Sequence, residues 1–319
     1  MSLLVARVLC DTVDTMLQLV VPPLTSLEHK GSMGRIGVIG GSQDYCGAPY
    51  YSAISALKFG ADLAWVYCSK DSAVPIKSYS PELIVTPFYD EDTARSIDVV
   101  ANSPRVNAFL IGPGLGRNPN VVYIIGNIMH GAKLSNMPMV IDADGLWVIQ
   151  HNFNLIHGYT NCILTPNKVE FERLLCLVES TKPSADGVPS SIAARRLFAL
   201  SAALGGVTVL RKGQYDMVAS TTGASLYGLV FVVEAQGSPR RCGGLGDVLS
   251  GVTAVALHWA LQSEESISAR NACVHACILA SIVAKQASEL AFVSKGRSMT
   301  APDVIDQIGA AFRKVHPEG

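Results

Sequence analysis

The sequence predicts an α/β protein with a mostly parallel central sheet and helices on both faces. Three observations favour this fold class. Charged residues make up only 16% of the 319 residues, whereas about 25% is typical of soluble chains. The 28 glycines are scattered through the chain, and 49% of the residues are hydrophobic. Short apolar runs alternate with helical patterns, as expected for strands that are buried on both faces of a parallel sheet.

The elements follow in an alternating order. Helical spacing predicts a first helix at 11–21, which ends at Pro22-Pro23. Short apolar runs predict parallel strands at 35–39, 63–68, 108–111, 138–141, 162–164 and 207–210. Helical patterns between them predict helices at 52–60, 118–131, 145–151, 168–178 and 190–204. Antiparallel strands are expected at 216–219 and 229–234, followed by helices at 247–261, 269–290 and 302–315. We expect one domain over 16–319 and an N-terminal extension over 1–15.

Composition excludes several classes of function. Lys and Arg number 25 and Asp and Glu 26, a net charge of −1, so no electrostatic footprint for nucleic acid is expected. The most apolar stretches, 251–261 and 272–284, are shorter than the ~20 residues of a membrane span. Eight cysteines in 319 residues fit reduced thiols rather than a disulfide framework. We therefore expect a cytoplasmic protein, with a mitochondrial location as the weaker alternative.

Polar or glycine-rich motifs follow nearly every predicted strand. In open α/β sheets, ligands bind outside the carboxyl ends of the strands. These motifs are therefore expected to converge on one crevice.

The strongest motif is Cys242-Gly243-Gly244-Leu245-Gly246-Asp247-Val248-Leu249-Ser250-Gly251. Its glycines let backbone N–H groups face a ligand, and the helix that follows adds unpaired donors and a positive dipole end. Together they predict an anion hole for a transferred phosphoryl group, with Asp247 as a general base beside it. The alternative is that Asp247 only complements the helix dipole.

This glycine–aspartate pattern resembles the ribokinase-like superfamily of small-molecule kinases. Further motifs at 30–42, 45–49, 55–63, 112–116, 140–146 and 164–171 make the chain similar to the ATP-dependent (S)-NAD(P)H-hydrate dehydratase family. The resemblance runs from about residue 16 to 315. It is to the eukaryotic form, because ADP-using bacterial relatives usually have His where Asn167 stands.

The resemblance implies a ribokinase-like three-layer sandwich and a nicotinamide-nucleotide repair enzyme. Such an enzyme uses ATP to phosphorylate the ring hydroxyl of the S-epimer of hydrated NADH or NADPH, and then eliminates phosphate. Mg²⁺ is expected to accompany ATP, without a dedicated protein metal site. A separate NAD(P)H-hydrate epimerase is the implied functional partner, and self-association is left open. The alternatives are a vitamin-precursor kinase of the same superfamily and a non-catalytic nucleotide sensor.

The resemblance also implies which residues form the site. Asp247 is the implied catalytic residue and contacts the hydrate. The other hydrate-contacting positions are Gly114, Asn167, Lys168, Val169, Glu170, Phe171, Glu172 and Arg173. The implied ATP contacts are Lys212, Gly213, Gln214, Tyr215, Asp216, Gly237, Ser238, Pro239, Arg240, Arg241, Cys242, Gly243, Gly244, Leu245 and Gly246.

Several of these residues have a purely structural alternative. Lys212 suits a phosphate but also a solvated loop. Asn167 and Glu170 lie on one helical face and are expected either to hold a hydrated Mg²⁺ or to cap the helix, with a dual role favoured for Asn167. Asp142 and Asp144 are expected to orient water or metal or to close an Asx-turn, and the turn is favoured for at least one of them.

Overall fold

The computed structural model describes residues 3–8, 20–89, 106–178, 191–221, 228–263 and 269–316. Its strands form one ten-stranded sheet in the order β1-β10-β9-β8-β7-β6-β5-β2-β3-β4. The strands are β1 (Leu3–Val8), β2 (Arg35–Ile39), β3 (Leu63–Ser69), β4 (Ile84–Tyr89), β5 (Ala108–Ile111), β6 (Met139–Ile141), β7 (Cys162–Leu164), β8 (Thr208–Arg211), β9 (Asp216–Ser220) and β10 (Gly228–Val233).

Parallel pairing runs through most of the sheet. Every neighbouring pair from β4 across to β8 is parallel, and β9 is antiparallel to both β8 and β10. The predicted parallel strands and the predicted antiparallel additions are both confirmed. The carboxyl ends of the parallel strands therefore meet at one edge of the sheet, as a binding crevice requires.

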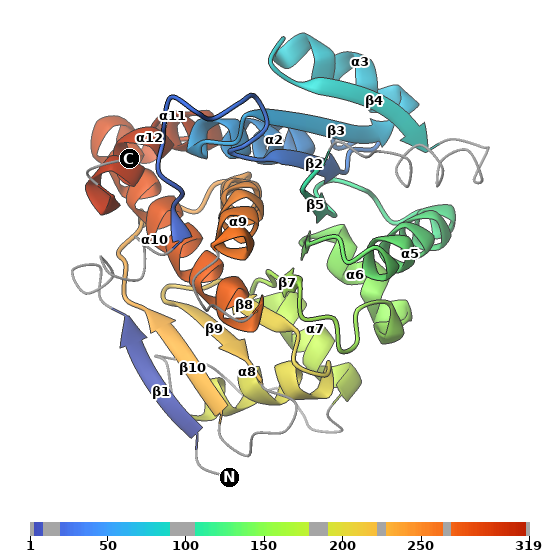
Figure 1. The fold of residues 1–319 in the computed structure, drawn as a ribbon, viewed down its shortest axis with the longest axis vertical. Coiled ribbons are helices and arrows are strands. Elements are labelled where there is room, and N and C mark those ends of the chain that lie inside the picture. Colours follow the sequence, from blue (N-terminus) through green and yellow to red (C-terminus); the bar gives the residue numbers. More distant parts are fainter. Residues whose placement is uncertain are drawn as a thin grey trace.

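Helices cover both faces of the sheet. They are α2 (Gly47–Phe59), α3 (Lys70–Tyr79), α5 (Pro119–Leu134), α6 (Asp144–His151), α7 (Lys168–Val178), α8 (Ser191–Ala203), α9 (Leu245–Gln262), α10 (Ala269–Lys295), α11 (Ala301–Asp306) and α12 (Ile308–Val315), with short 3₁₀ turns at Phe153–Leu155 and Gly296–Ser298. Figure 1 shows the strands following one another from β1 to β4, with α9 and α10 on one side and α5 and α6 on the other.

Two hydrophobic cores define the three layers. Leu110 and Val140 belong to one core, which is shared with α2, α9 and α10. Their neighbours Ile111 and Ile141 belong to the other, which is shared with α5, α6, α7 and α8. Successive strand residues point to opposite faces, so the alternation divides the two cores. The three-layer α/β sandwich expected from the sequence is confirmed.

Helix α9 packs very closely against α2. A Cβ atom at Gly251 would lie 2.2 Å from the carbonyl oxygen of Ser52, so only glycine permits this approach. Helix α10 lies against α9, and the stretch Asn271–Ser298 is, within the described residues, the one helical segment long and apolar enough to span a membrane; 61% of its apolar 18-residue window is buried. That burial is typical of a core helix.

Three differences from the sequence prediction stand out. Residues Leu3–Val8, expected as part of an extension, form β1 and pair with β10, and Arg7 forms a 3.0 Å ion pair with Glu234. Helix α3 and strand β4 were not predicted. The helix expected at 302–315 is divided into α11 and α12 around Gln307. Most of the helix expected at 11–21 lies outside the described residues.

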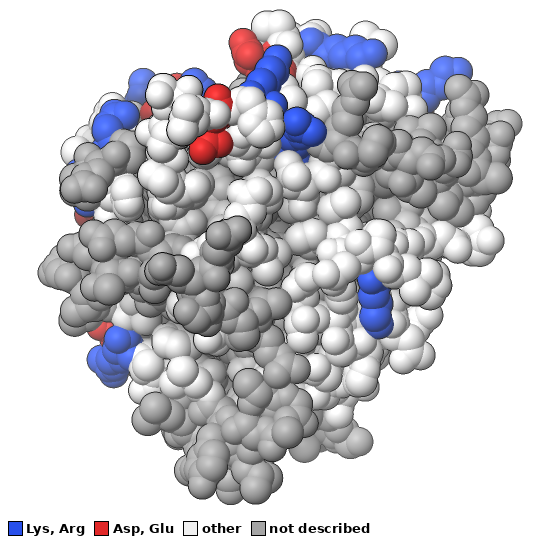
Figure 2. All heavy atoms as spheres, in the orientation of Figure 1, with Lys and Arg blue, Asp and Glu red and all other residues white. Residues whose placement is uncertain are grey.

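Charged side chains are unevenly spread over one face of the molecule. Figure 2 shows that most of the described Lys, Arg, Asp and Glu residues visible on this face lie along its upper edge.

Candidate active site

Loops at the carboxyl ends of the parallel strands enclose two neighbouring cavities. Loops that follow β2, β3, β5 and β6 line a larger cavity of about 1070 Å³. Loops that follow β7 and β8 line a smaller cavity of about 410 Å³. The amino end of α9 contributes to both, because Asp247 lines the larger cavity and Gly246 the smaller one. The expected crevice therefore has two compartments.

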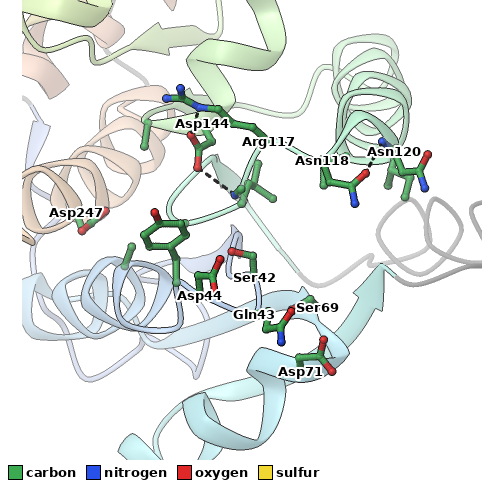
Figure 3. A pocket seen from close by; sticks show the side chains of 18 residues that line it. Ser42, Gln43, Asp44, Ser69, Asp71, Arg117, Asn118, Asn120, Asp144 and Asp247 are labelled. Atoms are coloured by element: carbon green, nitrogen blue, oxygen red, sulfur yellow. Dashed lines mark hydrogen bonds and ion pairs between the residues drawn. The ribbon is translucent and has the colours of Figure 1, made fainter.

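The larger cavity is lined mostly by polar residues. Figure 3 shows Asp247 on one side of the cavity and Asn118 and Asn120 on the opposite side, with Asp44 between them. Tyr45 also lines the cavity, with 58% of its surface exposed. The cavity thus offers hydroxyl, carboxylate and amide groups and one exposed aromatic ring to a polar ligand.

Glycines shape the loop that follows β5. A Cβ atom at Gly112 would lie 1.7 Å from the carbonyl oxygen of Asp142, and one at Gly114 would lie 2.7 Å from that of Tyr45. Both glycines have positive φ values, 131° and 64°. Ala143 also has a positive φ, of 48°, a conformation that costs free energy in a residue with a side chain. The loops that follow β5 and β6 therefore lie close together, and this arrangement strains the backbone at Ala143.

The side chains of Asp142 and Asp144 make hydrogen bonds other than the one that closes an Asx-turn. Asp144 accepts hydrogen bonds from the backbone N–H of Gly116 and from Nε of Arg117, both at 3.0 Å. Asp142 is 1% exposed and accepts from the backbone N–H of Ala143 at 2.9 Å. An Asx-turn would need the N–H two residues further on. The turn prediction is therefore wrong, because the backbone carbonyl of Asp142 closes the turn with Gly145.

Three carboxylates gather around Lys212. Its Nζ lies 2.6 Å from Oδ1 of Asp142. Burial lowers the pKa of Lys212, but the neighbouring Asp142 and Glu170 carboxylates outweigh this, so that the pKa is raised and the ammonium stays charged. Burial and the charge of Asp142 raise the pKa of Asp247 to about 8, against the opposing effect of Lys212. A pKa this close to the working pH is suited to proton transfer, with the ionised form of Asp247 as the base.

The amino end of α9 faces the same cluster. Gly244 precedes the helix with a φ of 93° and provides no side-chain cap, which leaves the N–H groups of the first turn available to a ligand. A Cβ atom at Gly246 would lie 3.3 Å from Nζ of Lys212. Backbone donors and an ammonium thus lie on one side of Asp247, an arrangement suited to a transferred phosphoryl group.

Asn167 and Glu170 form a capping box at the start of α7. Oδ1 of Asn167 accepts from the backbone N–H groups of Val169 and Glu170 at 2.9 and 3.0 Å. Oε2 of Glu170 in turn accepts from the backbone N–H of Asn167 at 2.8 Å. The capping alternative is thus present. Asn167 also lines the smaller cavity, which keeps a second role open to it.

Most of the implied ATP contacts gather at the smaller cavity. Its lining includes Lys212, Gly213, Gln214, Asp216, Gly237, Arg241, Leu245 and Gly246. Others support the loop: Ser238 is 2% exposed, and its hydroxyl accepts from the N–H of Arg240 at 2.9 Å. Arg240 donates from Nε to the carbonyl oxygen of Met299. The remaining implied contacts lie in two loops. The loop between β8 and β9 contains Tyr215, and the loop between β10 and α9 contains Pro239, Cys242, Gly243 and Gly244.

The implied hydrate contacts are divided. Gly114 lines the larger cavity together with Asp247. Lys168, Val169, Glu172 and Arg173 line a third cavity of about 550 Å³ on the outer side of α7. Glu172 pairs there with Arg196 at 2.6 Å, and Phe171 is 1% exposed in the core. Contact of these α7 residues with the hydrate stays a prediction.

A family model for NAD(P)H-hydrate dehydratase matches residues 36–310. The chain belongs to this family. It is 43% identical over 306 residues to the ATP-dependent (S)-NAD(P)H-hydrate dehydratase of Rattus norvegicus, a match that covers 95% of this chain and 86% of the rat protein. The family assignment rests on this similarity along nearly the whole chain.

Solved structures share the fold of this NAD(P)H-hydrate dehydratase family member. A ribokinase-like superfamily protein from Enterococcus faecalis superposes with a TM-score of 0.72 at 21% identity, covering 98% of this chain and 96% of that one. An ADP/ATP-dependent NAD(P)H-hydrate dehydratase from Bacillus subtilis, co-crystallized with ATP and Mg²⁺, gives 0.67 at 19% identity, with coverages of 94% and 97%. The ribokinase-like fold is confirmed.

Sequence reasoning missed several residues of the larger cavity. Asp44, Asp71 and Arg117 line it, yet none stands in a motif that is specific on its own. A weak signal was available, since each follows a strand end by only a few residues. The described part of the chain contains no group of three or more His, Cys, Asp or Glu side chains placed to hold a metal ion.

Proposed function

We propose that this protein is an ATP-dependent (S)-NAD(P)H-hydrate dehydratase that returns hydrated NADH and NADPH to their active forms. One observation of the site carries the proposal. Asp247, with its raised pKa, lines the larger cavity, while the adjacent Gly246 lines the smaller one beside Lys212. A hydrate in the larger cavity and ATP in the smaller one would meet at this peptide. Membership of the NAD(P)H-hydrate dehydratase family supports the same activity.

Phosphoryl transfer is the first step. Asp247 takes the proton of the ring hydroxyl while that oxygen forms a bond to the γ-phosphorus of ATP. The bond from the γ-phosphorus to its bridging oxygen breaks, and ADP leaves with the electron pair. The ammonium of Lys212 and the amide groups at the start of α9 stabilise the charge on the transferred group.

Elimination of phosphate is the second step. Hydroxide is a poor leaving group, whereas phosphate is a good one. The ring carbon–oxygen bond breaks with assistance from the lone pair of the ring nitrogen, and the adjacent carbon loses a proton, so that the ring double bond forms again. The oxygen of the added water leaves in the phosphate. The products are NADH or NADPH, ADP and phosphate.

We propose that Mg²⁺ enters with ATP and is held by Asp142 and Glu170 together with phosphate oxygens and water. The donor set fits this ion, because Mg²⁺ prefers oxygen ligands and is usually bound by one or two carboxylates plus substrate phosphates. Asp142 uses Oδ1 for the hydrogen bonds given above, and Glu170 uses Oε2. When bound, the ion would neutralise charge on the phosphates.

The partner and the compartment are also proposals. An enzyme that accepts one epimer of the hydrate needs a second activity that converts the other epimer, and we assign that activity to a separate epimerase. The seven cysteines in the described ranges are all free thiols, which supports a reducing, cytoplasmic location. Cell fractionation tests the location, and sedimentation velocity measures whether copies associate.

The test of the activity follows the reduced nicotinamide band at 340 nm. Purified protein is mixed with hydrated NADH and Mg²⁺, with ATP, with ADP or without nucleotide. Recovery of the band only with ATP, with one phosphate released per NADH, is the expected result. Recovery with ADP as well would correct the nucleotide preference. A flat trace with demonstrated ATP binding would contradict the dehydratase and favour a kinase for a small alcohol, the alternative from the same superfamily.

A further inference from the structure

Helix α10 carries a polar stripe on the face that it turns towards the smaller cavity. Ser281, Lys285 and Ser288 are spaced four and three residues apart, which places them on one face of the helix. Their neighbours Ile282 and Ala287 are fully buried. The stripe faces the smaller cavity, because Lys285 and Ser288 are among its lining residues. Buried polar groups need hydrogen-bond partners. For these three side chains the partners lie in the loops at 212–216 and 237–241.

Lys285 binds the loop between β8 and β9. Its Nζ donates to the carbonyl oxygens of Gly213 at 3.0 Å and Gln214 at 2.8 Å, and it lies 3.4 Å from Oδ1 of Asp216. The side chain is 11% exposed. An ammonium group has three donors, and three acceptors surround this one. Lys285 is therefore arranged to hold the loop rather than to bind a phosphate directly.

Ser281 completes the attachment of the same loop. Its hydroxyl donates to Oδ2 of Asp216 at 2.6 Å, while Oδ1 accepts from the backbone N–H of Gly213 at 2.8 Å. Asp216 is 4% exposed, so both of its oxygens are bound inside the protein. The loop that begins at Lys212, whose ammonium lies beside Gly246, is thus tied to α10 at both ends.

Ser288 binds the second loop. Its hydroxyl accepts from the backbone N–H of Ser238 at 3.0 Å and donates to the carbonyl oxygen of Lys285 at 2.8 Å. A Cβ atom at Gly237 would lie 3.2 Å from that hydroxyl. The loop at 237–241 therefore rests directly on the same helical face as the loop at 212–216.

We propose that Ser281, Lys285 and Ser288 are positioning residues that hold the two walls of the nucleotide cavity at the spacing that ATP requires. The inference rests on the proposed function, since it assigns the smaller cavity to ATP. The stripe acts through the loops and touches neither the hydrate nor the reacting atoms. Its removal therefore weakens ATP binding and leaves hydrate binding unchanged.

The test is a direct titration of ATP, with Mg²⁺ and without hydrate, against Lys285→Met and Ser288→Ala. We expect the Kd for ATP to rise about tenfold for Lys285→Met, which corresponds to about 1.4 kcal/mol, and a few-fold for Ser288→Ala. In the 340 nm assay the KM for ATP rises by the same factors, while the KM for hydrated NADH is unchanged. Lys285→Arg, which keeps the donors, restores most of the affinity.

Lys133→Met is the matched control. Lys133 on α5 also donates from Nζ to two backbone carbonyl oxygens, those of Asn154 at 3.2 Å and His157 at 2.8 Å, and it lines neither of the two cavities. Its substitution removes comparable hydrogen bonds from a different part of the molecule. Its Kd for ATP should equal that of the wild type.

Two results would overturn the positioning role. One is a wild-type Kd for ATP in both Lys285→Met and Ser288→Ala. The other is an equal loss of affinity in Lys133→Met, which would show a general effect of stability. The proposed function fails separately, if wild-type protein binds ATP but restores no 340 nm absorbance, because the titration needs no turnover. Wild-type protein that binds no ATP would overturn both.

Discussion

Asp247 combines exposure to a cavity with the electrostatics of a buried group. Burial and the nearby Asp142 carboxylate raise its pKa to about 8, and Lys212 alone among the neighbours that act on it lowers the pKa. A base is most effective when its pKa lies near the working pH. Because of this raised pKa, the carboxyl of Asp247 is mostly protonated in the resting protein at pH 7.

The first prediction concerns the pH dependence of turnover. Because Asp247 must be ionised to take the hydroxyl proton, kcat/KM should rise with pH and level off above about pH 8. The measurement is the initial rate of 340 nm recovery from pH 6 to 9 at low hydrate concentration. A profile without a rising limb across that range would contradict the role of Asp247 as the base.

The second prediction is that Asp247→Asn separates binding from turnover. The amide cannot take a proton, so kcat should fall by about 10²–10⁴-fold, while ATP and hydrate still bind. The free energy of unfolding at pH 8 and above should increase, because a desolvated carboxylate is removed. Titration, steady-state kinetics and thermal unfolding measure the three effects.

Asp306→Asn is the control for this substitution, since Asp306 lies on α11 and is exposed. It should change neither kcat nor the unfolding temperature. Turnover by Asp247→Asn at the wild-type rate would remove the argument for a catalytic carboxylate and would favour a nucleotide sensor.

Residues of the site differed in how well the sequence predicted them. Asp247 and the glycines around it stand in one continuous motif, so the local pattern was enough to predict their place at the crevice. Lys285 and Ser288 could not be found in this way, because they interrupt an apolar helix 38 or more residues after Asp247 and meet the site only through tertiary packing. The residues at the start of α7 show the reverse. They stand together in one motif, but the fold places their side chains at the smaller cavity, at the third cavity and in the core.

At the scale of elements, the start of α9 leaves little space for a side chain beside Lys212. The helix must bring its first backbone N–H groups beside Lys212 without any side chain between them. Gly246 provides that space, as a Cβ atom there would lie 3.3 Å from Nζ. This distance is tight enough that the end of a flexible lysine would move aside.

The third prediction follows from this contact. Gly246→Ala should fold normally but displace the Lys212 ammonium by a few tenths of an ångström, and kcat/KM for ATP should fall about tenfold. The matched change is Gly131→Ala on α5, where an added Cβ meets nothing within 4 Å and should leave the kinetics unchanged. Equal kinetics for the two variants would show that the space beside Lys212 is not required.

Strands were predicted better than the elements around them. The bounds of β2, β5 and β7 agree with those expected from the apolar runs. Helix α3 was missed because Pro75 lies inside it, and β4 because Pro87 lies within the strand. Strand β1 was missed because only its pairing with β10, far along the chain, distinguishes it from an N-terminal extension. Propensity rules cannot supply that partner.

At the scale of the whole molecule, a buried histidine makes the free energy of unfolding depend on pH. His258 of α9 is 5% exposed, and a Cβ atom at Gly34 would lie 2.7 Å from its ring. Burial lowers the pKa of His258 to about 4 from 6.5. The imidazole is therefore neutral in the folded protein at pH values where it is charged in the unfolded chain.

The fourth prediction concerns the contribution of His258 to stability in mild acid. Between pH 6.5 and pH 4 the unfolded chain binds a proton at this residue that the folded chain does not, so this contribution to the free energy of unfolding decreases as the pH falls, by up to about 3 kcal/mol. The raised pKa of Asp247 acts in the opposite direction over the same range, because there the folded chain binds the additional proton. Urea unfolding of the wild type and of His258→Gln at pH 7 and pH 5 isolates the histidine: the stability of the variant relative to the wild type should rise on acidification, whereas that of the exposed His130→Gln should not change. An identical pH dependence in the wild type and His258→Gln would contradict the role of the buried imidazole.

The division of the crevice into two compartments has a kinetic consequence. Gly246 and Asp247 are consecutive residues that line different cavities, so in the proposed assignment ATP and the hydrate lie side by side and no side chain is needed to carry the phosphoryl group. Both ligands must then occupy the protein at the same moment. Double-reciprocal plots for the two substrates should intersect rather than run parallel, and a single in-line displacement should invert the configuration of an isotopically chiral γ-phosphoryl group.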